Sequence, residues 1–173
     1  NLSNANVSNI SLNNVNVTGN RYVGGFISYV NIAYITNIKV EDIWITGTQY
    51  VGGIVGQQNH QSGKTSDGLT KVIARNINVE STGNYAGGIV GYGNAKNIEL
   101  NECEVSGISY VGGVGGQISE TSDEEKNSII SDIVVQGTGN YIGGYSGFDS
   151  GSSSNISLFH IEVVASNVTS KYV

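Results

Sequence analysis

One seven-residue stretch, residues 50–56 (Tyr-Val-Gly-Gly-Ile-Val-Gly), recurs four more times along the chain and most constrains its fold. The relatives begin at Tyr22, Tyr85, Tyr110 and Tyr141, and each has a tyrosine, an apolar residue and a glycine pair in the same order. Repeats spaced by a few tens of residues indicate stacked structural units rather than one globular core. The chain is therefore predicted to be a solenoid.

A second repeated unit precedes each glycine pair, occurs once more after the last pair, and has the form apolar-x-apolar-x-x-apolar-x-apolar. Alternation on either side of a two-residue break predicts two short strands that meet at a corner, with the apolar side chains inside. The Asn, Gly and β-branched content makes a helix a poor alternative. The inward positions form four columns: Ile10, Ile38, Val72, Ile98, Ser128 and Ile156; Leu12, Val40, Ala74, Leu100, Ile130 and Leu158; Val15, Ile43, Ile77, Cys103, Ile133 and Ile161; Val17, Ile45, Val79, Val105, Val135 and Val163.

Sequence spacing separates a rigid part of the repeat from a variable part. The first apolar residue of the unit precedes the second glycine of the next pair by 15 or 16 residues in all five cases, whereas the following stretch varies from 10 (88 to 98) to 19 (53 to 72). Stacked strands must keep register, but a loop that leaves a corner need not. We predict an all-β fold, a right-handed parallel β-helix of about five to six coils with three short strands per coil. One domain spans residues 1–173, with loop insertions over 57–70 and 117–127.

The glycine pair separates two apolar positions by three residues, as in Val51 and Ile54, and strict alternation cannot put both on one face. We predict a bend at the pair that turns both inward, because glycine adopts backbone angles closed to other residues and lets neighbouring coils approach. The tyrosine before each pair should stack on its equivalents as an aromatic ladder. The predicted corner glycines are Gly24, Gly25, Gly52, Gly53, Gly87, Gly88, Gly112, Gly113, Gly143 and Gly144.

Charge and hydropathy exclude two classes of partner. A net charge of −6 argues against nucleic acid, whose binding depends on Lys and Arg contacts to phosphate. No run approaches the ~18 apolar residues that a membrane span needs, so no membrane insertion is predicted. The chain contains no Met and opens without a signal-peptide pattern, which favours a segment of a longer protein or a mature product.

Groups that could carry catalysis are scattered. A polysaccharide lyase or hydrolase on a β-helix needs clustered carboxylates. Asp42, Glu102 and Asp132 share a column at the predicted corner, but other residue types interrupt it, so a solvated corner is the preferred interpretation. His60 and His160 lie in different coils, and Cys103 lies on an inward column, where a buried thiol is expected to be inert. We predict no catalytic residue, no cofactor and no metal site.

The residues expected to form an interaction surface are one tryptophan and the charged residues of the insertions. Trp44 points outward, between Asn16 and Asn78 of its column, and an exposed aromatic side chain can mark a contact surface. The run Asp123-Glu124-Glu125 lacks the glycine and ligand spacing of a calcium loop and is interpreted as a solvated charge run. The remaining candidates, in the first insertion, are His60, Lys64 and Asp67.

Laid out in this way, the sequence resembles the GLUG-motif repeats of bacterial surface and secreted proteins. The match rests on residues 50–56 and on the strand and turn of residues 97–107 (Asn-Ile-Glu-Leu-Asn-Glu-Cys-Glu-Val-Ser-Gly), and it covers nearly the whole chain. Similar repeats accompany immunoglobulin A protease-type zinc metallopeptidases of Gram-positive bacteria. The metallopeptidase motif is absent from this sequence, so the resemblance implies a β-helical, extracellular, non-catalytic module and names no ligand.

Two functions remain open on the sequence. The first is a structural or adhesive module, a rigid stalk or recognition platform in a bacterial cell-surface or secreted protein, with a host protein or glycan as its partner. The second is a carbohydrate-active or carbohydrate-binding β-helix, which would need a cleft with paired carboxylates or exposed aromatic residues. The open ends of a β-helix are unpaired edges, so flanking domains of the same chain or end-to-end self-association are also expected.

Overall fold

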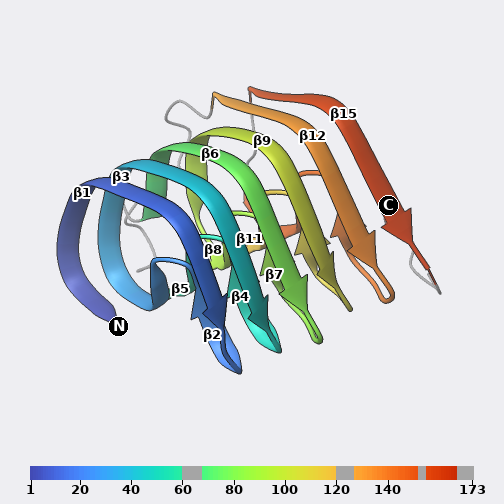
Figure 1. Cartoon of the computed structure of the whole chain (residues 1–173), viewed down its shortest axis with the longest axis horizontal. Coiled ribbons are helices and arrows are strands. Elements are labelled where there is room, and N and C mark those ends of the chain that lie inside the picture. Colours follow the sequence, from blue (N-terminus) through green and yellow to red (C-terminus); the bar gives the residue numbers. More distant parts are fainter. Residues whose placement is uncertain (60–67, 120–126, 152–154, 167–173) are drawn as a thin grey trace.

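The computed structural model describes residues 1–59, 68–119, 127–151 and 155–166. It confirms the predicted class: the described residues form no helix, and their parallel strands stack into a β-solenoid of about five turns. Figure 1 shows the coils side by side along the long axis, from β1 (Leu2–Thr18) at one end to β15 (Ile156–Ala165) at the other. Each side of the solenoid is thus made of equivalent strands from successive coils.

A complete coil contributes three strands, such as β4, β5 and β6. The strands at the Tyr-Val-Gly position are short and form a five-stranded sheet: β2 (Arg21–Gly24), β4 (Gln49–Gly52), β7 (Ala86–Gly87), β10 (Val111–Gly112) and β13 (Ile142–Gly143). The other strands form one ten-stranded sheet. It contains the strands after the glycine pair, which are β5 (Val55–Asn59), β8 (Val90–Gly93), β11 (Gly115–Ile118) and β14 (Ser146–Asp149), and the longer strands β1, β3 (Ile27–Gly47), β6 (Gly68–Ser81), β9 (Ala95–Gly107), β12 (Ser128–Gly137) and β15.

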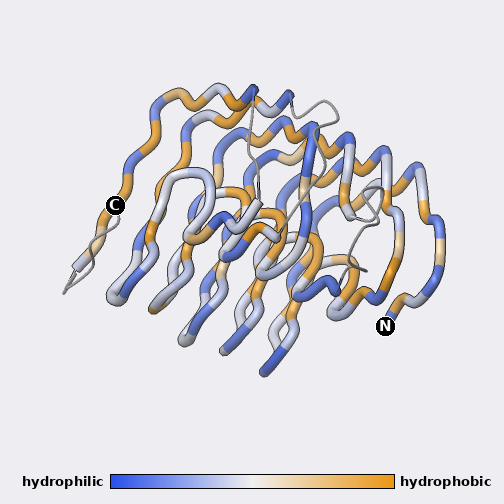
Figure 2. Tube along the Cα trace, turned by 180° about the vertical axis from the view of Figure 1, so that it is seen from behind, coloured by the Kyte–Doolittle hydropathy of each residue, from blue (hydrophilic) through white to orange (hydrophobic). Residues whose placement is uncertain are grey.

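The strand register aligns the four predicted columns of inward side chains. In the third column, Val15 lies opposite Ile43, Ile43 opposite Ile77, and Ile77 opposite Cys103. The members from the interior coils are at most 4% exposed, and each large one stabilises the fold by roughly 1.5–3 kcal/mol. Figure 2 shows the result as hydrophobic positions that alternate with hydrophilic ones along the long strands.

The irregular member of the first column, Ser128, is matched by a second irregular residue. Ser128 is buried, and its hydroxyl accepts a hydrogen bond from the backbone N–H of Ile98 (3.2 Å). Tyr145 occupies the position after the glycine pair where other coils have Ile54 or Ile89, and its side chain hydrogen-bonds to Ser128. Burial raises the pKa of the Tyr145 phenol to about 12. A small residue and a large residue therefore compensate for each other, and both hydroxyls have a partner.

The corners are made by residues in the left-handed backbone region. Eighteen non-glycine residues in the described chain have φ between 50° and 65°, and they recur at equivalent places. Asn and Asp tolerate this region better than most residues. The corner predicted inside the apolar repeat is confirmed. The left-handed residue is the second of the two residues between the paired strands: Asn14, Asp42, Asn76, Glu102, Asp132 and His160. The other columns are Asn9, Asn37, Lys71, Asn97 and Asn155; the five ladder tyrosines; and Asn4 with Ile32.

Of the two reasons predicted for the glycine pair, the close approach of neighbouring coils is confirmed and the unusual backbone angle is wrong. Left-handed φ occurs at the tyrosine before each pair, and the left-handed glycines are Gly68 and Gly93, neither of which belongs to a pair. The paired glycines are needed for space instead. A Cβ on Gly52 would overlap the carbonyl oxygen of Val55, and a Cβ on Gly53 would overlap that of Gly88 in the next coil. The inward orientation of Val51 and Ile54 is confirmed, since both are fully buried.

The third glycine of the motif is equally constrained, which the sequence analysis did not predict. A Cβ on Gly56 would lie 2.7 Å from the backbone nitrogen of Val23, in the Tyr-Val strand of the preceding coil. The equivalent Gly91, Gly116 and Gly147 are crowded by backbone atoms in the same way. The first coil has Ser28 at this position, and Ser28 is exposed. Glycine is therefore required only where a Tyr-Val strand of another coil packs against this position.

The aromatic ladder is confirmed. The rings of Tyr22, Tyr50, Tyr85, Tyr110 and Tyr141 stack in that order with centroids 4.6–5.2 Å apart. Three further rings, Tyr29, Tyr92 and Phe148, contact the stack edge-to-face, and they come from the strands that follow the glycine pair. Such contacts contribute about 0.5–1.5 kcal/mol each beyond area burial.

The strands extend further into the expected loops than the sequence indicated. Residues 57–59 belong to β5 and residues 68–70 to β6, so the insertion placed at 57–70 is shorter at both ends. Likewise, residues 117 and 118 belong to β11. The described strands also include the first residues of the chain, since Leu2 pairs with Val30 and Ala5 with Ala33.

Both ends of the stack leave the inner columns partly exposed. Ile10, Leu12 and Val15 of β1 are half-buried, whereas their equivalents in β3 are fully buried. At the other end, Leu158 of β15 is 45% exposed. The end strands therefore present apolar side chains, and no described strand pairs with their outer edges.

Ile32 is the β-branched residue among the left-handed positions, with φ of 53°, and it does not belong to the core cluster. Replacing it with asparagine, the residue at the equivalent Asn4, should raise the free energy of unfolding by about 1 kcal/mol because the backbone strain is relieved. Urea unfolding followed by circular dichroism measures this difference. Ile108→Asn is the control, since Ile108 is exposed without left-handed φ, and an equal gain there would contradict the explanation.

Candidate functional site

Of the residues proposed for an interaction surface, Trp44 lies within the described chain. It is on the outer face of β3, between the inward Ile43 and Ile45, and its exposed fraction is 40%. Asn16 lies beside it on β1, and Asn78 lies beside it on β6. The other candidates lie outside the described residues: His60, Lys64, Asp67, Asp123, Glu124 and Glu125.

The side chain of Trp44 has no hydrogen bond or aromatic contact with other residues in the described ranges. Its indole ring could donate one hydrogen bond and offer one flat apolar face, and the flanking amides of Asn16 and Asn78 can both donate and accept. This arrangement is suited to contact with an external molecule. It contains no group that would act as an acid, base or nucleophile.

The acidic residues of the corner column are bonded to partners in neighbouring coils. Asp42 accepts a hydrogen bond from the side chain of Asn76 (2.6 Å). Glu102 accepts two from Arg75, at 3.2 and 3.3 Å, and this bonding raises the pKa of the Arg75 guanidinium.

The last acid of the column, Asp132, has two partners. The side chain of Asn101 donates to it (3.0 Å), and a ring nitrogen of His160 lies 3.2 Å from its other oxygen. The carboxylates of this column lie on an exposed edge of the solenoid. Each is hydrogen-bonded to a side chain of an adjacent coil and does not point into a cleft. Surface pairs of this kind contribute little to stability, because solvent screens the exposed charges. The corner therefore joins successive coils and does not form a paired-carboxylate site.

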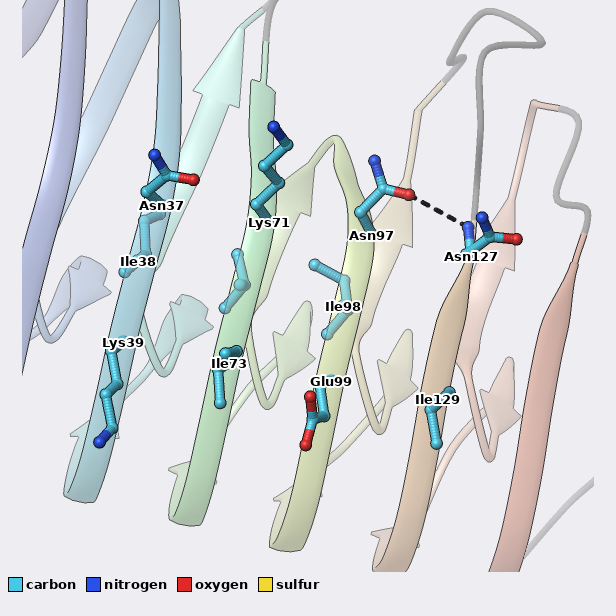
Figure 3. Close-up of a pocket in the computed structure, with 11 residues that line it drawn as sticks. Asn37, Ile38, Lys39, Lys71, Ile73, Asn97, Ile98, Glu99, Asn127 and Ile129 are labelled. Carbon is cyan, nitrogen blue, oxygen red and sulfur yellow. Dashed lines mark hydrogen bonds between the residues drawn. The ribbon is translucent and has the colours of Figure 1, made fainter.

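A shallow trough on the adjacent outer face was missed by the sequence analysis. Its volume is about 430 Å³, and it crosses β3, β6, β9 and β12. Figure 3 shows its two walls as two rows of side chains that run across the strands, and successive members of a row come from successive coils. One wall consists of Asn37, Lys71, Asn97 and Asn127, and the other of Lys39, Ile73, Glu99 and Ile129.

Two isoleucines distinguish this face from an ordinary solvated sheet face. Ile73 is 50% exposed and Ile129 is 55% exposed, on either side of Glu99. The other coils have Ser11, Lys39 and Ser157 at the same position. The sequence signal that could have found the trough is therefore an apolar residue between two inward apolar residues, at a position where the side chain points outward. Ile73 and Ile129 are such residues.

The buried thiol and the potential metal ligands offer no reactive centre in the part of the chain that the structure describes. Cys103 is 4% exposed, and burial raises the pKa of its thiol far above the usual range, so the thiolate form is disfavoured. No group of three or more His, Cys, Asp or Glu side chains is placed to hold a metal ion within these ranges. The described residues also include no helix that is long and apolar enough to cross a membrane.

The fold and the surface together define a β-solenoid with bonded corners, an exposed tryptophan and a mixed polar and apolar trough. Comparison with protein-family models, with curated proteins and with solved structures gave no match. The resemblance to GLUG-motif repeats therefore stays a prediction from the sequence.

Proposed function

We propose that the chain is a non-catalytic recognition and spacer module of a bacterial cell-surface or secreted protein. The observation that carries this proposal is the unbroken pairing of the long strands from β1 to β15. Every coil is joined to the next by backbone hydrogen bonds, so the stack resists bending and holds its outer faces in fixed positions. At about 4.8 Å per coil, the six long strands span about 24 Å.

The surface chemistry supports recognition rather than turnover. Asp42, Glu102 and Asp132 are bonded to side chains of neighbouring coils on an exposed edge, whereas hydrolysis of a glycosidic bond needs two carboxylates on either side of that bond. Trp44 and the trough offer contact area, and Glu99 is the one carboxylate among the residues that line the trough in the described chain. The extracellular, Gram-positive setting follows from the GLUG resemblance alone, and the host protein or glycan as partner is part of the adhesive-module hypothesis, because the resemblance names no ligand.

Incubation with polysaccharides, followed by analysis of chain length, tests the non-catalytic part of the proposal. We expect no shortening by the wild-type chain. If the wild-type chain shortens a polysaccharide and Asp42→Ala or Asp132→Ala abolishes that activity, the proposal is overturned, because the substituted residue would then act on substrate. The variants should remain folded, since these exposed hydrogen bonds contribute about 1 kcal/mol or less.

Arrays of glycans and of host surface proteins test the recognition part. We expect binding that is weakened by substitution on an outer face, with Trp44→Ser as one variant and Ile108→Ser as the control. Ile108 is comparably exposed, at 44%, but lies outside both the Trp44 surface and the trough.

A further inference from the structure

We propose that the trough across β3, β6, β9 and β12 binds a neutral, extended β-linked glycan that runs along the solenoid axis. This inference rests on the proposed function and names its partner. It concerns residues of the described chain that belong neither to the acidic corner nor to the Trp44 surface.

The direction and spacing of the trough favour a sugar chain over a peptide. The walls repeat once per strand, about every 4.8 Å, and four strands give a length of about 14 Å. A β-1,4-linked pyranose chain is straight and advances by close to one strand spacing per sugar, so about three sugars would each meet an equivalent set of side chains. An extended peptide advances about 3.3 Å per residue and would lose this match after one strand.

Four of the trough side chains have unused bonding capacity. The side chains of Lys39, Lys71 and Glu99 make no hydrogen bond or ion pair with other described residues, and the side-chain amide of Asn127 is also without one. Asn37 and Asn97 are bonded within the protein, to Asn9 (3.2 Å) and Thr70 (3.3 Å). In the corner column, the carboxylates of Asp42, Glu102 and Asp132 all have bonded partners. The trough therefore presents more free donors and acceptors to an external ligand than the corner does.

Charges of both signs lie in and beside the trough, which favours a neutral ligand over an acidic polymer. The charged residues that line it are Lys39, Lys71 and Glu99. An acidic polymer would also meet the carboxylates of the neighbouring corner, which are Asp42, Glu102 and Asp132.

The isoleucines supply the apolar part of such a site. A pyranose ring has an apolar face of C–H groups with hydroxyls at its rim, and a concave site with few polar groups around apolar contacts matches this pattern. Ile73 and Ile129 would contact sugar rings two strands apart, while Glu99 between them would accept a hydroxyl hydrogen bond.

Titration with cello-oligosaccharides and chito-oligosaccharides from dimer to hexamer tests the inference by calorimetry or saturation-transfer NMR. Affinity should rise with length up to about three or four sugars and then level off, because the trough is about 14 Å long. Raising the salt concentration should leave affinity unchanged, since a neutral ligand releases no counterions on binding.

Three variants locate the site. Ile73→Ser and Asn127→Ala should each weaken binding by about tenfold, whereas Ile108→Ser, on an equally exposed isoleucine outside the trough, should not. Thermal unfolding midpoints close to that of the wild type would show that the variants are folded. Absence of binding in both oligosaccharide series, or equal affinity of the wild type and the two trough variants, would overturn the inference.

The outcomes also separate this inference from the proposed function. If Trp44→Ser abolishes glycan binding and the trough variants do not, the trough assignment is wrong while a recognition module remains. If the oligosaccharides are shortened during the titration, the non-catalytic function itself is wrong.

Discussion

Replacing Gly53 with valine should lower the free energy of unfolding by at least about 3 kcal/mol. A Cβ at this position would overlap the carbonyl oxygen of Gly88 and come within 2.9 Å of Ile77. Both neighbours belong to the next coil, where the carbonyl of the adjacent Gly87 accepts a hydrogen bond from the backbone N–H of Gly53 (3.2 Å), so neither can move without disturbing the stacking. Overpacking against flexible side chains costs about 1–3 kcal/mol, and backbone neighbours leave less room for adjustment. Urea unfolding followed by far-UV circular dichroism measures the effect.

Ser28→Val is the matched control for this substitution. Ser28 belongs to the same motif in the first coil but is exposed, so the same β-branched residue should change stability by no more than about 0.5 kcal/mol. Equal destabilisation by both variants would mean that the glycines are not required for the approach of neighbouring coils.

Leu100→Ala should destabilise the protein by about 3 kcal/mol. Leu100 lies in the middle of the second inward column, and only 1% of it is exposed. Deleting its side chain leaves a cavity that the flanking Ala74 and Ile130 cannot fill, because backbone pairing fixes the strands on both sides. Equilibrium unfolding in urea, with the slope compared between variants, gives the difference.

Leu158→Ala tests the same column at its open end. Leu158 is 45% exposed, so its truncation should cost less than about 1 kcal/mol. A loss as large as that of Leu100→Ala would show that Leu158 is covered in solution, by further residues of the chain or by a second molecule. The pair of variants therefore measures both core packing and the state of this end.

The inward columns and the main corner could be predicted from the sequence because strand periodicity and register leave few alternatives. Once Val40 and Ile43 are both inward, the two residues between them must turn the chain, and Asp42 does so with left-handed φ. The tyrosine ladder follows from the same register. The left-handed conformation of the tyrosines themselves did not follow, because aromatic residues have no preference for it and the stacking of coils imposes it.

The role of each glycine could not be separated by sequence alone. A Cβ on Gly52 would meet its own turn and the next coil, one on Gly53 the next coil, and one on Gly56 the preceding coil. The atoms of other coils are distant in sequence, so no local pattern shows which glycine meets which coil. The close approach of coils at the glycine pair was predicted correctly, whereas the unusual backbone angle assigned to the pair was wrong.

The candidate surface was predictable only in part. Trp44 stands out because it is a tryptophan at an outward position. Ile73 and Ile129 occupy equally outward positions, yet they were not recognised, because a β-branched residue in a strand is ordinarily assigned to the core. Ile73 and Ile129 form one surface because they lie two strands apart along the same trough, and only the three-dimensional stacking shows this.

The contrast between Ser28 and Gly56 bears on how a chain of this type can gain or lose length during evolution. Duplicating an interior coil, which carries the third glycine, would insert a copy that fits between its neighbours and lengthen the molecule by about 4.8 Å. A duplicate of the first coil would place the side chain of Ser28 against the backbone of a Tyr-Val strand, where Gly56 has no room for one. Unequal recombination within the gene is thus expected to retain copies of interior coils and to eliminate copies of the first.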